Sequence, residues 1–195
     1  MNRQIKEPIF SLADIRKTGL RVYPYQLSLW RDEELLIKLK NGIYLFTARK
    51  DLVSNESVAF TIYQPSYISL EWALSHYGII PEMVYNVTSV TSKTTRTFKN
   101  DIGLFAYRHL KKDLFFGYKK VDDGKGMYLL AEPEKALLDY LYLNLAKLHD
   151  EADIEELRLN RFSMGEAVDK EKLMQYAEVF NSKKLDRILK ITVEK

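Results

Sequence analysis

The sequence predicts an α+β protein in which a small N-terminal unit precedes a larger one, and two observations predict it. Asn41-Gly42 stands between alternating apolar residues, which is the strongest short-range signal for a β-hairpin. Residues 85–131 contain several short runs rich in β-branched and aromatic residues, with turn residues between them and helical patterns on both sides. Such runs are typical of a mostly antiparallel sheet, here flanked by helices.

Two helical segments precede the hairpin. Residues 11–18 start with Ser11, a good N-cap residue, and carry Asp14 in the first turn. Residues 24–35 start with Pro24, because proline is favoured at the first position of a helix. We expect the buried side of this second helix to consist of Leu27, Trp30 and Leu35.

The hairpin, residues 37–46, alternates in polarity. Its apolar positions predict one buried face, and Lys38 and Lys40 are expected on the other face. An Asn-Gly pair favours a type I′ turn, in which both central residues have positive φ. Helix, turn, helix and two-stranded ribbon is the order of a winged helix-turn-helix, whose second helix enters the major groove of DNA. Lys38, Lys40 and Asn41 then form a wing that contacts phosphates.

The residue pattern leaves a second interpretation of this unit open. A small helical unit with a hairpin can also serve packing or dimerisation, and lysines on the outside of a hairpin are usually only solvated. The net charge of the chain, +3, does not by itself indicate nucleic acid. Positive charge is concentrated in residues 1–53, with ten Lys or Arg against six Asp or Glu, and in residues 88–125, with nine against four. This distribution permits a polyanionic partner without requiring one.

The polar residues 47–55 indicate a connection, so we place a domain boundary near residue 50, between residues 1–50 and 51–195. In the larger part the sequence predicts helices at 56–64, within 65–82, at 132–148, and at about 151–158 and 169–190. Ser69 can be the N-cap of the helix within 65–82. The helix at 132–148 has apolar residues at positions 137, 138, 141 and 145. The predicted strands are 85–92, 96–100, 103–110, 113–121 and 126–131.

No catalytic set is recognisable, and we expect no enzymatic activity, no cofactor and no metal. The chain has no cysteine and three histidines, His76, His109 and His149, none of them at metal-ligand spacing. Neither a nucleophile elbow nor a glycine-rich phosphate loop occurs. Asp123-Gly124-Lys125 places an acid before a lysine, as in some metal-dependent nucleases, but the glycines beside the lysine favour a surface turn.

The segment TSKTTRTFKN, residues 91–100, admits two interpretations. Lys93, Arg96 and Lys99 recur every third residue among threonines, and such cations and hydroxyls suit phosphate contacts. Lysine also discourages pairing at the edge of a sheet. Of the two, we favour an edge strand.

The chain is expected to be soluble. The first ten residues lack the apolar region of a signal peptide, and no stretch reaches the roughly 18 apolar residues that a membrane span needs. The absence of cysteine also fits a reducing compartment. We therefore expect a cytoplasmic protein without a membrane partner.

Several segments together resemble the AbiEi-like antitoxins, transcriptional regulators of bacterial abortive-infection (type IV toxin–antitoxin) systems. They are PSYISLEWALSHYGIIPE (65–82), TSVTSKTTRTF (88–98), GLFAYRHL (103–110), LFFGY (114–118) and AEPEKALLDYLYL (131–143), and they follow the hairpin sequence LKNGIYLF (39–46). The resemblance covers about residues 10–145, and the order of the segments makes it fairly specific.

The resemblance implies a winged helix-turn-helix that reads operator DNA, joined to a larger antitoxin domain. It also implies a functional partner, a nucleotidyltransferase-like toxin, which the antitoxin counteracts while it represses its own operon. The DNA-facing positions are then Tyr25, Gln26, Ser28 and Arg31 on the second helix, and Lys38, Lys40 and Asn41 on the wing. Members of the family usually have a further helix where only about ten residues are available here, so the DNA-binding unit is expected to be abbreviated. The alternative is a protein-interaction module that neutralises a toxin without binding DNA.

Overall fold

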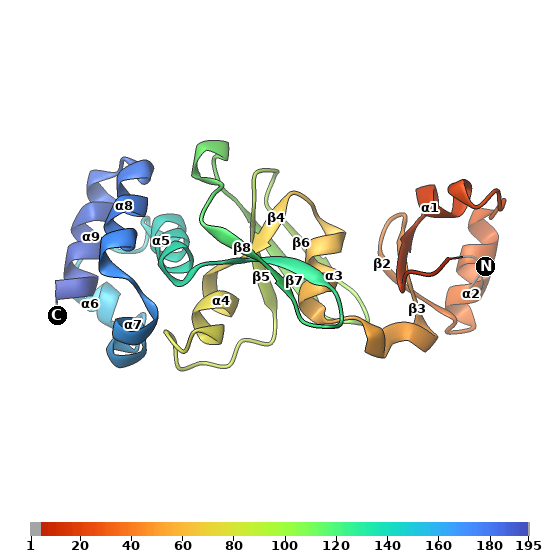
Figure 1. The fold of residues 1–195 in the computed structure, drawn as a ribbon, viewed down its shortest axis with the longest axis horizontal. Coiled ribbons are helices and arrows are strands. Elements are labelled where there is room, and N and C mark those ends of the chain that lie inside the picture. Colours follow the sequence, from red (N-terminus) through yellow and green to blue (C-terminus); the bar gives the residue numbers. More distant parts are fainter. Residues whose placement is uncertain (1–4, 195) are drawn as a thin grey trace.

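A computed structural model of the chain describes residues 5–194, which are arranged as a series of layers (Figure 1). The N-terminal unit, residues 5–53, holds helices α1 (Leu12–Lys17) and α2 (Pro24–Asp32) and a three-stranded sheet. The larger unit, residues 54–194, begins with α3 (Asn55–Ile62), which lies between that small sheet and a six-stranded sheet. Further helices cover the far face of the larger sheet, so the fold class is α+β, as predicted.

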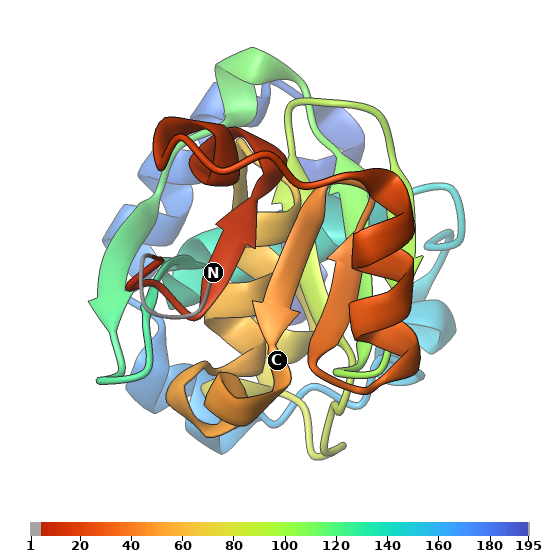
Figure 2. The same cartoon turned by 90° about the vertical axis from the view of Figure 1, so that its right-hand side faces the viewer.

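The small sheet consists of β1 (Ile9–Ser11), β2 (Leu36–Lys40) and β3 (Ile43–Phe46) in the antiparallel order β1-β3-β2. Figure 2 looks onto this unit and shows the three strands side by side, with α2 along one side of them. A separate apolar cluster lies between the strands and the two helices, formed by Ile5, Phe10, Ile15, Leu27, Leu36, Tyr44 and Phe46.

The first helix has the predicted ends, whereas the second is shorter than predicted. Ser11 caps α1 in a capping box, in which its hydroxyl accepts the Asp14 N–H and the Asp14 carboxylate accepts the Ser11 N–H. Helix α2 ends at Asp32, because Glu34 takes a left-handed φ of 56°. Three successive acids, residues 32–34, lie at the negative end of the helix dipole, where their charge is unfavourable for continuing the helix. The expected burial of Leu35 is therefore wrong, since this side chain is 54% exposed.

The hairpin turn has two residues, as predicted, but it is not a type I′ turn. Lys40 pairs with Ile43, and of the two residues between them only Gly42 has a positive φ, 80°. The register shifts between Lys38 and Lys40, which marks a β-bulge in β2. A bulge supplies strand twist that a primed turn would otherwise provide. It also turns Lys40 away from the face that carries Lys38.

Both faces of the hairpin are buried, which corrects the expected solvent-facing side. Ile37, Leu39 and Leu45 pack into the core of the larger unit. Leu36, Tyr44 and Phe46 project the other way, into the small cluster beneath α1 and α2. Side-chain alternation predicted the first face. The second face was misjudged because its apolar residues are spread over both strands and are mixed with lysine.

Replacing Gly42 with Val is expected to lower the free energy of unfolding by about 1–3 kcal/mol. A Cβ at this position meets only Leu12 Cδ1, at 3.9 Å, so the cost is the left-handed backbone rather than a collision. Gly42→Asn is the matched control, because asparagine tolerates this conformation, and it should cost clearly less. Urea denaturation measures both; equal losses in the two variants would contradict this explanation.

The larger sheet is mixed: three of its five strand pairings are antiparallel, in line with the mostly antiparallel sheet predicted, and two are parallel. Its strands are β4 (Ser66–Ile68), β5 (Val87–Thr91), β6 (Arg96–Lys99), β7 (Leu104–His109), β8 (Tyr118–Asp122) and β9 (Met127–Ala131), in the order β6-β7-β5-β4-β9-β8. The pairs β4–β9 and β5–β7 are parallel, and the other three are antiparallel. Residues 66–68, which precede the predicted cap Ser69, were not predicted as a strand, because three residues are too few to display a period of two. They form a fully buried central strand.

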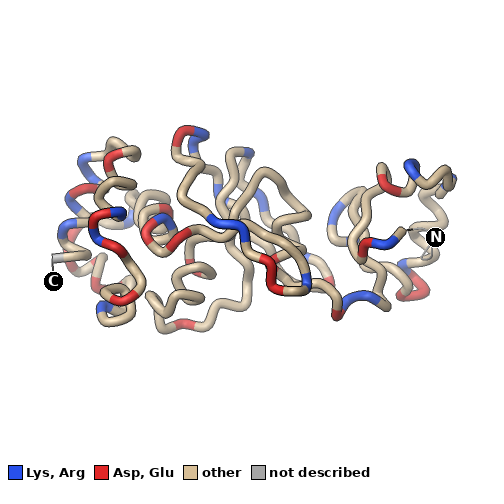
Figure 3. The backbone as a smooth tube through the Cα atoms, viewed as in Figure 1, with Lys and Arg blue, Asp and Glu red and all other residues tan. Residues whose placement is uncertain are grey.

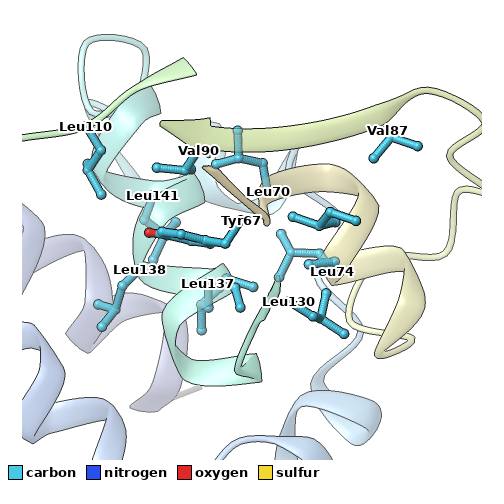
Figure 4. Packing of buried hydrophobic residues seen from close by; sticks show 14 of the residues in the cluster. Tyr67, Leu70, Leu74, Val87, Val90, Leu110, Leu130, Leu137, Leu138 and Leu141 are labelled. Carbon is cyan, nitrogen blue, oxygen red and sulfur yellow. The ribbon is translucent and has the colours of Figure 1, made fainter. Parts of the chain in front are cut away.

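Helices α4 (Leu70–His76) and α5 (Pro133–Asn144) cover one face of this sheet, and α3 covers the other (Figure 1). Leu137, Leu138 and Leu141 of α5 are fully buried, as predicted. Figure 4 shows these residues packed near Leu74 of α4 and Tyr67 of β4. This cluster forms the main core of the molecule.

The C-terminal region consists of α6 (Glu151–Glu155), α7 (Arg161–Ala167), α8 (Lys170–Phe180) and α9 (Lys183–Glu194). The single helix predicted at 169–190 is broken at Asn181, whose φ is 44°. Two short 3₁₀ helices, Thr47–Leu52 and Lys112–Leu114, lie elsewhere in the chain, and the second replaces the first half of the strand predicted at 113–121. Within residues 5–194 no helix has the length and apolar composition needed to cross a bilayer.

Candidate nucleic-acid interface

The outer side of α2 carries exposed polar and aromatic side chains. Leu27 faces inward and is buried, whereas Tyr25 is 67% exposed and Ser28 and Arg31 lie on the surface. Among the described residues, no side-chain hydrogen bond or ion pair engages Ser28 or Arg31. The Tyr25 ring stacks on that of Tyr23, with centroids 6.0 Å apart. This face therefore offers hydrogen-bonding groups that are free to meet a ligand.

Gln26 is less free than its neighbours. Its Oε1 accepts the Tyr23 N–H at 2.9 Å, which closes the first turn of α2. The side chain is half-buried, and its amide nitrogen remains as a donor. Gln26 thus fixes the start of the helix in addition to any role in recognition.

Charge is distributed unevenly along α2. Three exposed acids, residues 32–34, follow Arg31 at the C-terminal end of the helix, where they would repel phosphates. At the N-terminal end, Arg16 and Arg21 line a groove of about 440 Å³ between α1 and the start of α2. The N-terminal end of α2, with these two arginines, is therefore more favourable to phosphates than the C-terminal end, where Arg31 precedes the three acids. Sequence reasoning missed both arginines, because their proximity to α2 depends on the loop between the helices.

The structure does not bring the three predicted wing residues together on one face. Lys38 lies opposite Tyr44, on the side of the hairpin that faces α1 and α2, and it is half-buried. Asn41 is exposed at the tip. The tip itself is held in place, because the Leu12 N–H donates to the Gly42 carbonyl at 3.1 Å and Asn100 Nδ2 donates to the Leu39 carbonyl at 2.9 Å.

Lys40 faces the larger unit. Its Nζ lies 5.9 Å from the ring centroids of both Tyr63 and Phe98. Burial lowers the pKa of Lys40, and the nearby charges of Lys93 and Arg96 lower it further. Figure 3 shows a basic stretch of the N-terminal unit on the side that faces the larger unit.

Strand β6 is an edge strand of the larger sheet, which confirms the favoured interpretation of residues 91–100. Arg96 lies opposite Tyr107, whose hydroxyl donates to the Ala59 carbonyl of α3, so Arg96 projects on the α3 side. Lys99, three residues on, projects from the opposite face.

The remaining polar candidates have structural partners. The His76 ring stacks on Trp72 at 5.3 Å, and burial lowers the pKa of His76. His109 Nδ1 lies 2.8 Å from the Lys93 carbonyl. Asp123 Oδ1 accepts the Lys125 N–H at 2.8 Å, which closes a surface turn. In the described part of the chain, no group of three or more His, Asp or Glu residues could hold a metal ion.

One buried ionic cluster was not predicted. Lys135 and Asp139, one turn apart on α5, form an ion pair, and both side chains are fully buried. The hydroxyls of Tyr67 and Ser69 donate to Asp139 Oδ2 at 2.8 and 2.9 Å. Ser69 therefore stands at the predicted cap position of α4, but its side chain binds Asp139 instead of capping the helix. With no solvent access, this cluster serves the fold.

A comparison of the sequence with models of protein families finds no match, and a comparison with curated proteins finds none either. Two surfaces of the molecule are candidates for function. One is the outer side of α2 with Arg16 and Arg21. The other is the place where Lys40 meets the residues near β6.

Proposed function

We propose that the chain is a DNA-binding transcriptional regulator with antitoxin character. The observation that carries the DNA-binding part is the exposure of Tyr25, Ser28 and Arg31 on a helix that stands directly before a β-hairpin. The order β1-β3-β2, with both helices inserted between β1 and β2, supports an abbreviated winged helix-turn-helix. In this proposal α2 enters the major groove of operator DNA.

Each exposed residue then has a defined role. Arg31 makes a bidentate contact to guanine, since its planar guanidinium matches the N7 and O6 acceptors. Ser28 and the free amide nitrogen of Gln26 supply further hydrogen bonds, and Tyr25 contacts sugar or phosphate. Arg16, Arg21 and Lys38 neutralise phosphates beside the groove. Asn41, at the tip of the hairpin, donates a hydrogen bond from its amide to a phosphate oxygen. Lys40 is turned away from this surface.

The antitoxin part of the proposal rests on the resemblance to the AbiEi-like antitoxins. The segments that carry this resemblance form β4, α4, β5 to β7 and α5. These elements pack around one core, which supports the proposal. In this proposal the protein represses its own operon and counteracts a nucleotidyltransferase-like toxin.

One observation favours the alternative, a protein-interaction module that neutralises a toxin without DNA. An apolar groove of about 590 Å³ opens beside the C-terminal end of α2, lined by Trp30, Leu35, Leu36 and Phe46 among others. Leu35, which was expected in the core, is largely exposed at this groove. A partner protein could bury these side chains.

Replacing Arg31 with Ala is expected to weaken binding to operator DNA by about 1–3 kcal/mol and binding to scrambled duplex by less. Because no described residue forms an ion pair with Arg31, the melting temperature should stay unchanged. Fluorescence anisotropy with both duplexes measures the change, and Lys183→Ala, on the distant helix α9, is the matched control. Equal losses of affinity for the two duplexes would show that Arg31 does not recognise a base.

A further inference from the structure

Three cations from separate segments meet where the two units join. We name Lys40, Lys93 and Arg96 the junction cluster. Lys40 comes from the end of β2, Lys93 from the connection between β5 and β6, and Arg96 from the start of β6. The Nζ atoms of Lys40 and Lys93 lie 5.9 and 5.7 Å from the centroid of the same Tyr63 ring. The register of β6 directs Arg96 to this side of the sheet.

The positive charge of the junction cluster is not balanced by protein groups. Within residues 5–194, no carboxylate forms an ion pair with any of its three members. In the described part of the chain, the contacts that oppose their mutual repulsion are those of the two lysines with Tyr63 and of Lys40 with Phe98. Lys93 and Arg96 are exposed and Lys40 is half-buried, so a ligand can reach them from solvent.

Hydroxyl groups stand beside these cations. The Tyr63 hydroxyl donates to the Thr94 carbonyl at 3.1 Å and lies 3.2 Å from Thr94 Oγ1. Converging cations together with hydroxyls form the surroundings that phosphate oxygens prefer in proteins. We propose that the junction cluster is a binding site for a compact, multiply charged phosphate group, such as a phosphate monoester or a diphosphate.

The arrangement fits a compact anion better than a nucleic-acid backbone. A backbone carries one charge per phosphate and needs cations placed along a track. Lys38 and Lys99, the lysines outside the cluster nearest in sequence to Lys40 and Arg96, could extend such a track, but both project in other directions. Lys38 projects toward α1 and α2, and Lys99 projects from the opposite face of β6. The three members of the junction cluster therefore lie near Tyr63 and on the α3 side of the sheet, without Lys38 or Lys99 to extend them into a track.

This site exists only when the two units are packed together. Lys40 belongs to the N-terminal unit, whereas Lys93 and Arg96 belong to the larger one. The hydrogen bond from Asn100 to the Leu39 carbonyl holds the hairpin at the required position. Ligand binding should therefore depend on residues from both units, and it does not rest on the proposed reading of DNA by α2.

Isothermal titration of the full chain with pyrophosphate, at ionic strength held constant with NaCl, tests this proposal. We expect saturable binding to the wild type. Lys93→Gln, Arg96→Gln and Lys40→Gln should each weaken it by at least about tenfold, because each substitution removes one charge-assisted contact with the ligand. Lys99→Gln, on the opposite face of the same strand, is the matched control and should bind like the wild type.

Three results would overturn the proposal. The first is the absence of saturable pyrophosphate binding. The second is an equal loss of pyrophosphate affinity in Lys99→Gln. The third comes from a parallel titration with a short DNA duplex. If the three variants lose affinity for the duplex but keep their affinity for pyrophosphate, the cluster contacts a nucleic-acid backbone instead. Arg31→Ala separates the two functions, since it should leave pyrophosphate binding unchanged.

Discussion

Replacing Lys135 with Met while Asp139 is kept is expected to lower the free energy of unfolding by about 3–5 kcal/mol, as for other broken buried ion pairs. The substitution leaves a fully buried carboxylate whose only remaining donors are the hydroxyls of Tyr67 and Ser69. Burial already raises the pKa of Asp139 and lowers the pKa of Lys135. Both directions are those expected where burial disfavours the charged forms.

The double variant Lys135→Met/Asp139→Leu separates the cost of an unpaired charge from the value of the pair. Removing both charges should restore much of the lost stability, because an apolar pair avoids the desolvation of two ions. The ring centroids of Phe116 and Phe180 lie 5.1 and 5.0 Å from Lys135 Nζ, so a methionine at position 135 has apolar neighbours. Urea denaturation of the wild type and both variants measures the effect. A double variant as unstable as the single one would show that the ion pair itself stabilises the fold.

Replacing Leu138 with Ala is expected to lower the free energy of unfolding by about 2–5 kcal/mol. Leu138 has no solvent exposure and belongs to the main apolar cluster that surrounds α5 (Figure 4). The loss combines the transfer of its methyl groups with the cavity that remains. Leu35→Ala is the matched control, because this side chain is 54% exposed and the same truncation should change stability by less than about 0.5 kcal/mol. Similar losses in both variants would contradict the assignment of the core.

Local signals in the sequence predicted local structure well. The Ser11 cap with Asp14, the two-residue turn before Ile43 and the apolar positions of α5 each depend on residues close together in the chain. These features need only the backbone preferences of a few neighbours. They were found without knowledge of tertiary packing.

Features that depend on distant residues were not predicted. Strand β4 is defined by its neighbours β5 and β9 rather than by its own three residues, so it was not predicted as a strand. Lys135 and Asp139 have the spacing of an ordinary exposed pair on a helix, and only packing of the surrounding layers buries them. Their burial has no sequence signal of its own.

The candidate sites also combine features that follow from local sequence with features that depend on tertiary packing. The exposed positions of α2 follow from helical periodicity, and Tyr25, Ser28 and Arg31 lie on its surface. The bulge in β2 could not be foreseen, and it separates Lys40 from Lys38. The approach of Lys40 to Lys93 and Arg96 joins segments more than fifty residues apart, so it depends on how the two units pack.

Binding of the wild-type protein to the DNA upstream of its own gene tests the central proposal most directly. A mobility shift is measured at low salt and over a salt series, on this DNA and on a scrambled duplex of the same length. The proposal predicts a complex that prefers the upstream DNA, with log affinity falling linearly against log salt at a slope of about −0.9 for each phosphate contact. No complex on the upstream DNA at low salt, or equal affinity for both duplexes, would contradict a sequence-reading role for α2.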